Sequence, residues 1–220
     1  MIRKTYEFAR VHAGECFRAI TALCSCLRAL RRVLTRKRPT SSDALKRAQV
    51  REKRVHARRA AAAEALLVAG GPDASSLALR VTTEFRLGAS TIYAAAAARL
   101  AAEGRRTELQ ELLRDSRASL ASQEDRDIML RAAAAAAATR GGWGASQQAE
   151  KLAAMVQDPR TRVLAYVGAH RLRAALGAAK ALGEAGEVAI VRAAASAALP
   201  PEKSIIDACD RWEAQQRDKS

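Results

Sequence analysis

Apolar residues recur at helical spacing from the beginning of the chain. In the first segment they lie three, four or occasionally six positions apart, at Phe8, Val11, Phe17, Ile20, Leu23, Leu27, Leu30 and Leu34. This spacing predicts one apolar face on an α-helix, which Pro39 ends. Ser41 to Asp43 offer N-caps for a second helix over about 43–69, and the Gly-Gly-Pro sequence at 70–72 terminates it.

Beyond residue 72 the chain consists of short segments separated by glycine, proline or polar residues. We expect helices over residues 73–86, 90–103, 105–119, 124–139, 147–157, 160–167, 171–183, 185–198 and 202–214. Short helices joined by tight turns are typical of stacked antiparallel hairpins. The pattern therefore predicts an all-α protein, an α-solenoid of hairpins like tetratricopeptide (TPR) repeats, although no fixed repeat of about 34 residues is visible.

Alanine supports this prediction. It occupies 53 of the 220 positions, whereas aromatic residues make up 4%. Residues that favour strands are scarce, which argues against a sandwich, a barrel or a doubly wound sheet. We expect the runs Ala94–Ala98 and Ala132–Ala138 at contacts where small side chains let two helices approach closely. The alternative is low-complexity drift, because a helix tolerates alanine at any position.

Positive charge is concentrated in the first part of the chain. Residues 1–60 contain 17 Lys and Arg but only 4 Asp and Glu, whereas the remainder contains 21 and 19. This segment thus accounts for +13 of the formal net charge of +15. We therefore divide the chain into a basic helical arm over 1–61 and an Ala-rich α-solenoid over 62–220.

The basic arm predicts a surface that binds anions. Its candidate anion-binding patch consists of Arg31, Arg32, Arg36, Lys37, Arg38, Lys46, Arg47, Arg51, Lys53, Arg54, Arg58 and Arg59. Such a cluster would bind nucleic-acid phosphates without sequence preference or dock on an anionic membrane. An acidic partner, or a solvated helix face with no ligand, fits it equally well. The Arg-rich start also resembles an organellar transit peptide, against which Glu7 and Glu15 argue.

Motifs for catalysis or cofactor binding are not visible. The sequence contains no GxSxG, no GxxxxGK[ST], no GxGxxG after a strand and no HExxH. Cys16, Cys24, Cys26 and Cys209 form no CxxC pair, and their spacing favours reduced thiols in an intracellular chain. We expect a protein that is not an enzyme, with no catalytic, cofactor-binding or metal-binding residue and no small-molecule substrate.

Three further features have structural interpretations. The Gly-Gly-Trp-Gly sequence at 141–144 predicts an inter-helix loop, in which Trp143 either anchors the loop on the solenoid or faces a partner. We favour the anchor. His170 lies at a helix turn and is expected on the surface or in a cap. Cys209 shares a helical stripe with Ile206 and Trp212, which predicts a buried position.

Ordered blocks between residues 62 and 213 resemble one known family. They include a helix ending R-V-x-x-E-F-x-L, a Tyr-containing helix ending A-A-R-x-L, a helix with spaced Leu, the sequence DRDIML, an Ala-Tyr pair and a terminal D-x-C-x-x-W. The residues are Arg80, Val81, Glu84, Phe85, Leu87, Tyr93, Ala97, Ala98, Arg99, Leu100, Leu109, Leu112, Leu113, 125–130, Ala165, Tyr166 and 205–212. In this order they resemble the C-terminal helical region of spastizin, the FYVE-domain zinc-finger protein linked to spatacsin and the fifth adaptor complex.

This resemblance implies a non-enzymatic scaffold in endosomal and lysosomal trafficking, with roles of the full-length family in cytokinesis and DNA repair. It implies a partner of the spatacsin or fifth-adaptor-complex type and a cytoplasmic location peripheral to these organelles, with nuclear or organellar import left open. The FYVE module needs paired Cys clusters to bind zinc and read phosphatidylinositol 3-phosphate. This chain contains no such clusters, so we assign zinc and lipid recognition to none of its residues. It would then be a shortened relative, a split subunit or a fragment, and the arm over 1–61 lies outside the resemblance.

Overall fold

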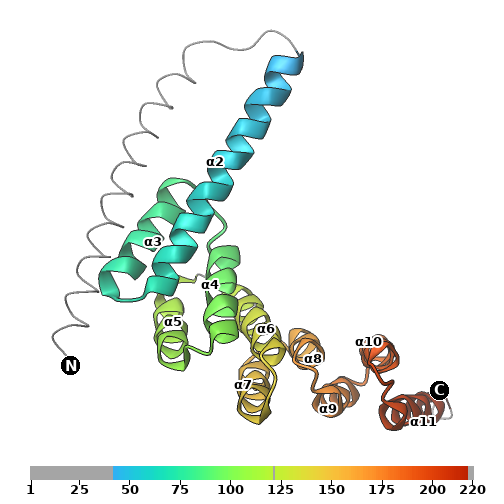
Figure 1. Cartoon of the computed structure of the whole chain (residues 1–220). Helices are drawn as coiled ribbons and strands as arrows, with labels where there is room; N and C mark the ends of the chain where they lie inside the picture. Colours follow the sequence, from blue (N-terminus) through green and yellow to red (C-terminus); the bar gives the residue numbers. More distant parts are fainter. Residues whose placement is uncertain (1–41, 121, 218–220) are drawn as a thin grey trace, which may run out of the picture. The chain divides into compact units, whose positions relative to one another are not determined.

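The computed structural model describes residues 42–120 and 122–217, in which all regular structure is helical (Figure 1). The helices are α2 (Ser42–Ala69), α3 (Pro72–Glu84), α4 (Ala89–Glu103), α5 (Arg106–Ser119), α6 (Gln123–Thr139), α7 (Trp143–Ala154), α8 (Pro159–Gly168), α9 (Leu172–Leu182), α10 (Ala185–Ala197) and α11 (Lys203–Arg217). The all-α prediction is confirmed. The helix expected from the apolar spacing between residues 8 and 34 lies outside the described residues.

The chain divides into two compact units, and the boundary between them falls within α2, between Lys53 and Arg54. The helix itself continues without a break to Ala69. The boundary that we place between 61 and 62 stays a prediction, since most of the expected arm lies outside the described residues. Helices α3 to α11 belong to the unit that begins at Arg54.

In this unit the helices form consecutive hairpins. α4 contacts α5, α6 contacts α7, α8 contacts α9, and α10 contacts α11. The first helices of these hairpins also contact one another in order, so that α4, α6, α8 and α10 form a continuous row (Figure 1). Contacts limited to neighbouring repeats define a solenoid, and the hairpins are TPR-like. The predicted architecture is therefore confirmed.

The contact between α4 and α6 is lined by alanine. Ala96, Ala97, Ala133, Ala134 and Ala137 have no solvent-exposed surface. Their methyl groups take up little space, so the two helix axes approach closely. The expectation that both alanine runs lie at helix contacts is confirmed.

A second apolar cluster occupies the C-terminal hairpins. Val163, Leu176, Val188, Cys209 and Trp212 belong to it, and Cys209 is fully buried. Burial raises the pKa of the Cys209 thiol, because the charged thiolate is disfavoured away from water. The prediction that Cys209 lies in a buried stripe is confirmed.

Three helices end in the same left-handed turn. Arg86, Gly104 and His170 adopt φ of 50°, 77° and 55°, after α3, α4 and α8. In each case the next amide donates to the carbonyl five residues earlier, as Arg171 N does to Tyr166 O at 2.9 Å. This is the Schellman arrangement. His170 is exposed and occupies the capping position, which confirms the sequence prediction.

Asp158 caps the start of α8 and makes a first prediction about pH. Its Oδ2 accepts a 2.7 Å hydrogen bond from Thr161 N, and the hydrogen bonds from Thr161 hold the pKa of Asp158 below its usual value. A lowered folded pKa means that the cap stabilises the protein above the unfolded pKa of about 3.9 and is lost as pH falls through the folded pKa. We expect Asp158→Ala to cost about 1 kcal/mol at neutral pH.

Chemical unfolding at neutral and acidic pH measures this effect. Asp158→Asn is the matched control, because an amide oxygen can still cap the helix but does not titrate. When the pH is lowered from neutral to below the folded pKa of Asp158, the free energy of unfolding should fall more in the wild type than in Asp158→Asn. Identical pH profiles would contradict the assignment.

Candidate functional site

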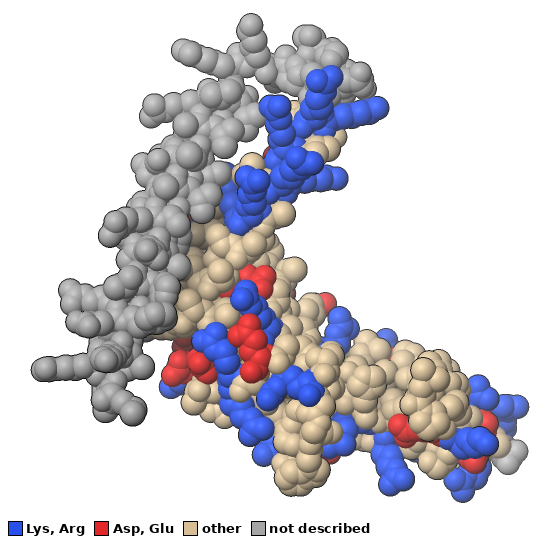
Figure 2. Space-filling model, viewed as in Figure 1, with Lys and Arg blue, Asp and Glu red and all other residues tan. Residues whose placement is uncertain are grey.

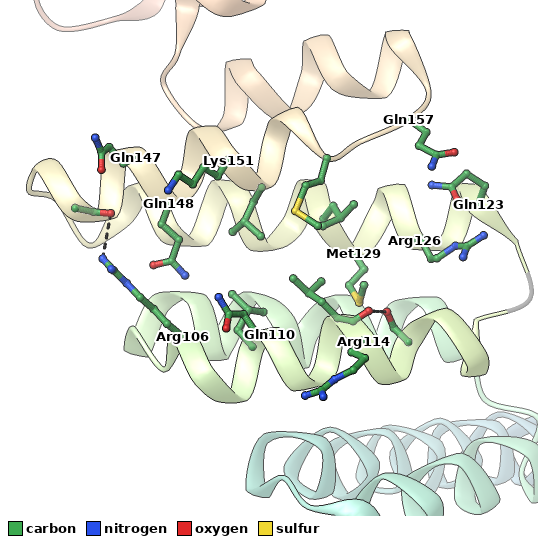
Figure 3. A pocket seen from close by; sticks show the side chains of 17 residues that line it. Arg106, Gln110, Arg114, Gln123, Arg126, Met129, Gln147, Gln148, Lys151 and Gln157 are labelled. Carbon is green, nitrogen blue, oxygen red and sulfur yellow. Dashed lines mark hydrogen bonds between the residues drawn. The ribbon is translucent and has the colours of Figure 1, made fainter.

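A groove of about 750 Å³ lies between α5 and α7, with α6 forming part of its floor (Figure 3). The first turns of both flanking helices lie at one end, where Arg106 Nη2 donates a 3.3 Å hydrogen bond to the Gly144 carbonyl. Gln123, Arg126 and Gln157 lie at the opposite end (Figure 3). The groove thus lies between two consecutive hairpins, one formed by α4 and α5 and the other by α6 and α7, and not within a single hairpin.

The floor of the groove is apolar. Leu109, Met129 and Leu152 contribute to it and are at most 5% exposed, so they also belong to the core. Leu113 is half-buried, and Met155 is 48% exposed. An unbranched thioether adapts to different apolar surfaces, which suits a contact that forms and separates.

The rim of the groove is polar and carries only positive charge. Five glutamines and four cations line it, and none of the 17 lining residues is Asp or Glu. The cations are Arg106, Arg114, Arg126 and Lys151. Gln110 and Arg114 lie on the α5 side, and Gln148 and Lys151 lie on the α7 side (Figure 3).

Most of these cations lack a partner. Among the residues that the structure describes, Arg114, Arg126 and Lys151 form no ion pair or side-chain hydrogen bond. Some arginines of the solenoid are paired, such as Arg160 with Glu184 at 2.6 Å and Arg192 with Asp210 at 2.6 Å, whereas others outside the groove, such as Arg131 and Arg173, are exposed and likewise unpaired among the described residues. The groove is therefore a place where positive charge is not neutralised by the described part of the chain.

Two buried polar atoms in the groove are also unsatisfied. Arg126 Nε and Gln148 Oε1 have almost no solvent-exposed surface and no hydrogen-bond partner in the described structure. A buried donor or acceptor without a partner costs free energy. Arg126 Nε is a donor and Gln148 Oε1 an acceptor, and both lie beneath the surface of the groove.

Asp127 fixes the far end of the groove. This carboxylate is 1% exposed and accepts three hydrogen bonds, from Gln157 N at 3.0 Å, Asp158 N at 2.7 Å and Gln123 Nε2 at 2.8 Å. Arg162 Nε adds a 2.8 Å bond to the Val156 carbonyl in the same connection. Asp127 therefore holds the link between α7 and α8 against α6.

Neither this role of Asp127 nor the groove was predicted from the sequence. The available signal for Asp127 was an acidic residue within the DRDIML segment, one helical turn after Gln123. Its partners follow 30 and 31 residues later, and nothing in the spacing connects them.

The candidate anion-binding patch is only partly described. Lys46, Arg47, Arg51, Lys53, Arg54 and Arg58 are exposed along α2 (Figure 2), whereas Arg31, Arg32, Arg36, Lys37 and Arg38 lie outside the described residues. Arg59 differs, because its Cζ lies 3.9 Å from the Phe85 ring centroid and contributes a cation–π contact to the fold. Binding of nucleic acid, anionic membrane or an acidic partner by this patch stays a prediction.

The interpretation of residues 141–144 needs a correction. Trp143 is the first residue of α7 and is 76% exposed, so it does not anchor a loop on the solenoid. Gly141 and Gly142 adopt φ of 68° and 81°, which lets the chain reverse within two residues and start the helix at once. The expected helix over 147–157 was therefore placed too late along the chain.

The described residues contain no group of three or more His, Cys, Asp or Glu side chains that could hold a metal ion. No helix in the described part of the chain combines the length and apolar character needed to cross a membrane.

Stacked TPR-like hairpins that frame a groove define a helical-repeat protein, a class that generally mediates protein–protein interaction. A family model described as ZFYVE26-like, TPR repeats matches residues 88–213, more than half of the chain. The chain belongs to this family. The match covers α4 to the greater part of α11 and supports the resemblance to the helical region of spastizin. No curated protein and no solved structure matches the chain.

Proposed function

We propose that this chain is a non-enzymatic helical-repeat scaffold that binds a protein partner in the groove between α5 and α7. The observation that carries the proposal is an apolar floor, with Met155 48% exposed, beneath a rim of unpaired cations. A surface that is apolar at its centre and polar at its edge has the composition of protein interfaces. TPR-like families generally serve as scaffolds, which supports a role in binding rather than in turnover.

The partner we propose is of the spatacsin or fifth-adaptor-complex type, and the setting is trafficking at endosomes and lysosomes. Membership of the ZFYVE26-like family supports this proposal, because the resemblance to spastizin implies these partners and this location. The roles in cytokinesis and DNA repair have the same support. The described residues contribute the groove, which gives such a partner a defined place to bind.

The experiment is capture of a spatacsin-type partner by the full chain and by Met155→Asp. Burying a methionine side chain contributes about 1.5–3 kcal/mol, so a carboxylate at its place should weaken capture about tenfold or more. Ile190→Asp is the matched control, since Ile190 is 38% exposed on α10, outside the groove. Its capture should equal that of the wild type.

Two results would contradict the proposal in different ways. Equal capture by Met155→Asp and wild type would remove the groove as the binding site. Absence of capture by the folded wild-type chain would remove the spatacsin-type partner. Far-ultraviolet circular dichroism on each variant verifies that the helices remain.

A further inference from the structure

We infer that the groove between α5 and α7 binds an acidic amphipathic α-helix of its partner. This inference rests on the proposed function and adds the chemistry of the bound segment. It is drawn from the dimensions of the groove, the nature of its floor and the distribution of charge on its rim.

The dimensions fit one short helix. α5 contains 14 residues and α7 contains 12 residues, and both line the groove. At a rise of about 1.5 Å per residue these helices are about 21 and 18 Å long. A partner helix of three to four turns would therefore contact both walls, α5 and α7, along its whole length.

The floor favours a helix with one apolar face. Leu113 and Met155 are its accessible apolar side chains, from α5 and from the residue that follows α7, and Met129 lies beneath them. Helices that bind in grooves present anchors at i, i+3 or i+4, and i+7 to such a floor. A nucleic-acid backbone would leave these apolar side chains without a partner, so a peptide fits the groove better.

The rim favours acidic flanks on that helix. Arg114 on α5 and Lys151 on α7 lie on opposite walls, both exposed, and Arg126 lies towards one end (Figure 3). Glu or Asp on either side of the apolar face would therefore meet a cation on each wall. Since no carboxylate lines the groove, a basic helix would be repelled rather than accommodated.

The test uses the full chain and three synthetic 14-residue peptides, labelled for fluorescence anisotropy. The first has Leu at i, i+3, i+4 and i+7 with Glu on both flanks, and a hydrocarbon staple on its outer face keeps it helical. The second replaces each Glu with Lys, and the third scrambles the first without a staple. We expect the full chain to bind the acidic helix more tightly than either of the others.

Charge reversal connects binding to the groove. Arg114→Glu with Lys151→Glu should weaken binding of the acidic helix about tenfold and improve binding of the Lys peptide. The matched control is Arg131→Glu with Arg173→Glu, which makes the same change in net charge at exposed positions outside the groove. Its affinity should stay within about twofold of wild type, because neither residue lines the groove and exposed charges are screened by salt. Lys151→Glu alone serves if the double variant does not fold.

Several outcomes would overturn the inference. Equal binding of the scrambled peptide, or equal losses in both double variants, would mean general attraction to a basic chain. Groove-dependent binding of a single-stranded oligonucleotide in place of the peptide would assign the site to nucleic acid. If Met155→Asp abolishes partner capture while the acidic helix does not bind, this inference fails and the proposed function stands. If the acidic helix binds in the groove but no spatacsin-type partner is captured, only the proposed partner fails.

Discussion

Asp127→Ala is expected to lower the free energy of unfolding by about 2–3 kcal/mol. The substitution removes all three hydrogen bonds of the carboxylate and leaves the amides of Gln157 and Asp158 without their acceptor. Both amides are partly buried, so water replaces the lost bonds only in part. The connection between α7 and α8 should loosen, and with it the end of the groove where Gln157 lies.

Chemical denaturation followed by circular dichroism measures this loss. Asp207→Ala is the matched control, because Asp207 is exposed on α11 and its carboxylate makes no hydrogen bond or ion pair with a described residue. It should change stability by less than about 0.5 kcal/mol. Asp127→Asn should fall between the two, since its amide retains one oxygen acceptor. A loss at Asp127→Ala no larger than at Asp207→Ala would show that the carboxylate does not hold the connection.

Ala97→Leu is expected to destabilise the protein by about 3 kcal/mol, at the upper end of the cost of overpacking. Ala97 is fully buried in the row formed by α4 and α6, and Ala133, Ala134 and Ala137 on α6 are fully buried as well. Three additional carbon atoms have no space there unless the helices separate. Separation would also expose the apolar surface that the two helices cover.

Ala102→Leu is the control for helix propensity. Ala102 lies on the same helix and is exposed, so the same substitution adds its side chain into solvent. Alanine and leucine differ little in helix propensity, and the control should stay within about 0.5 kcal/mol of wild type. The melting temperatures of the two variants separate the effect of core packing from the effect of helix propensity. Similar melting temperatures for the two would contradict close packing between α4 and α6.

Much of the fold follows from local signals in the sequence. Glycine and proline at 70–72, 104, 159 and 183 end or start helices because of their own backbone preferences. The observed α4, α6, α8 and α10 begin and end within one residue of the predicted ranges. Alanine runs predicted the contact between α4 and α6, because small side chains let two helices approach closely.

Local sequence signals predicted helix ends less well where an end depends on contacts with a distant part of the chain. The start of α7 was misplaced because glycine at 141, 142 and 144 indicated a loop, whereas the pair at 141–142 completes the reversal by itself. The end of α7 was placed too late because hydrogen bonds to the Asp127 carboxylate and from the Arg162 guanidinium hold 155–158 outside the helix. The bonds to Asp127 join residues 30 and 31 positions apart in the sequence.

The sequence by itself thus determined the helices, their approximate ends and the small-residue contact between α4 and α6. It did so because helix formation, capping and periodic burial depend on residues within a few positions of one another. Tertiary structure alone decided the groove, its unpaired cations and the buried carboxylate of Asp127. Arg114, Arg126 and Lys151 come from three different helices, and only the packing of consecutive hairpins brings their charges to one surface.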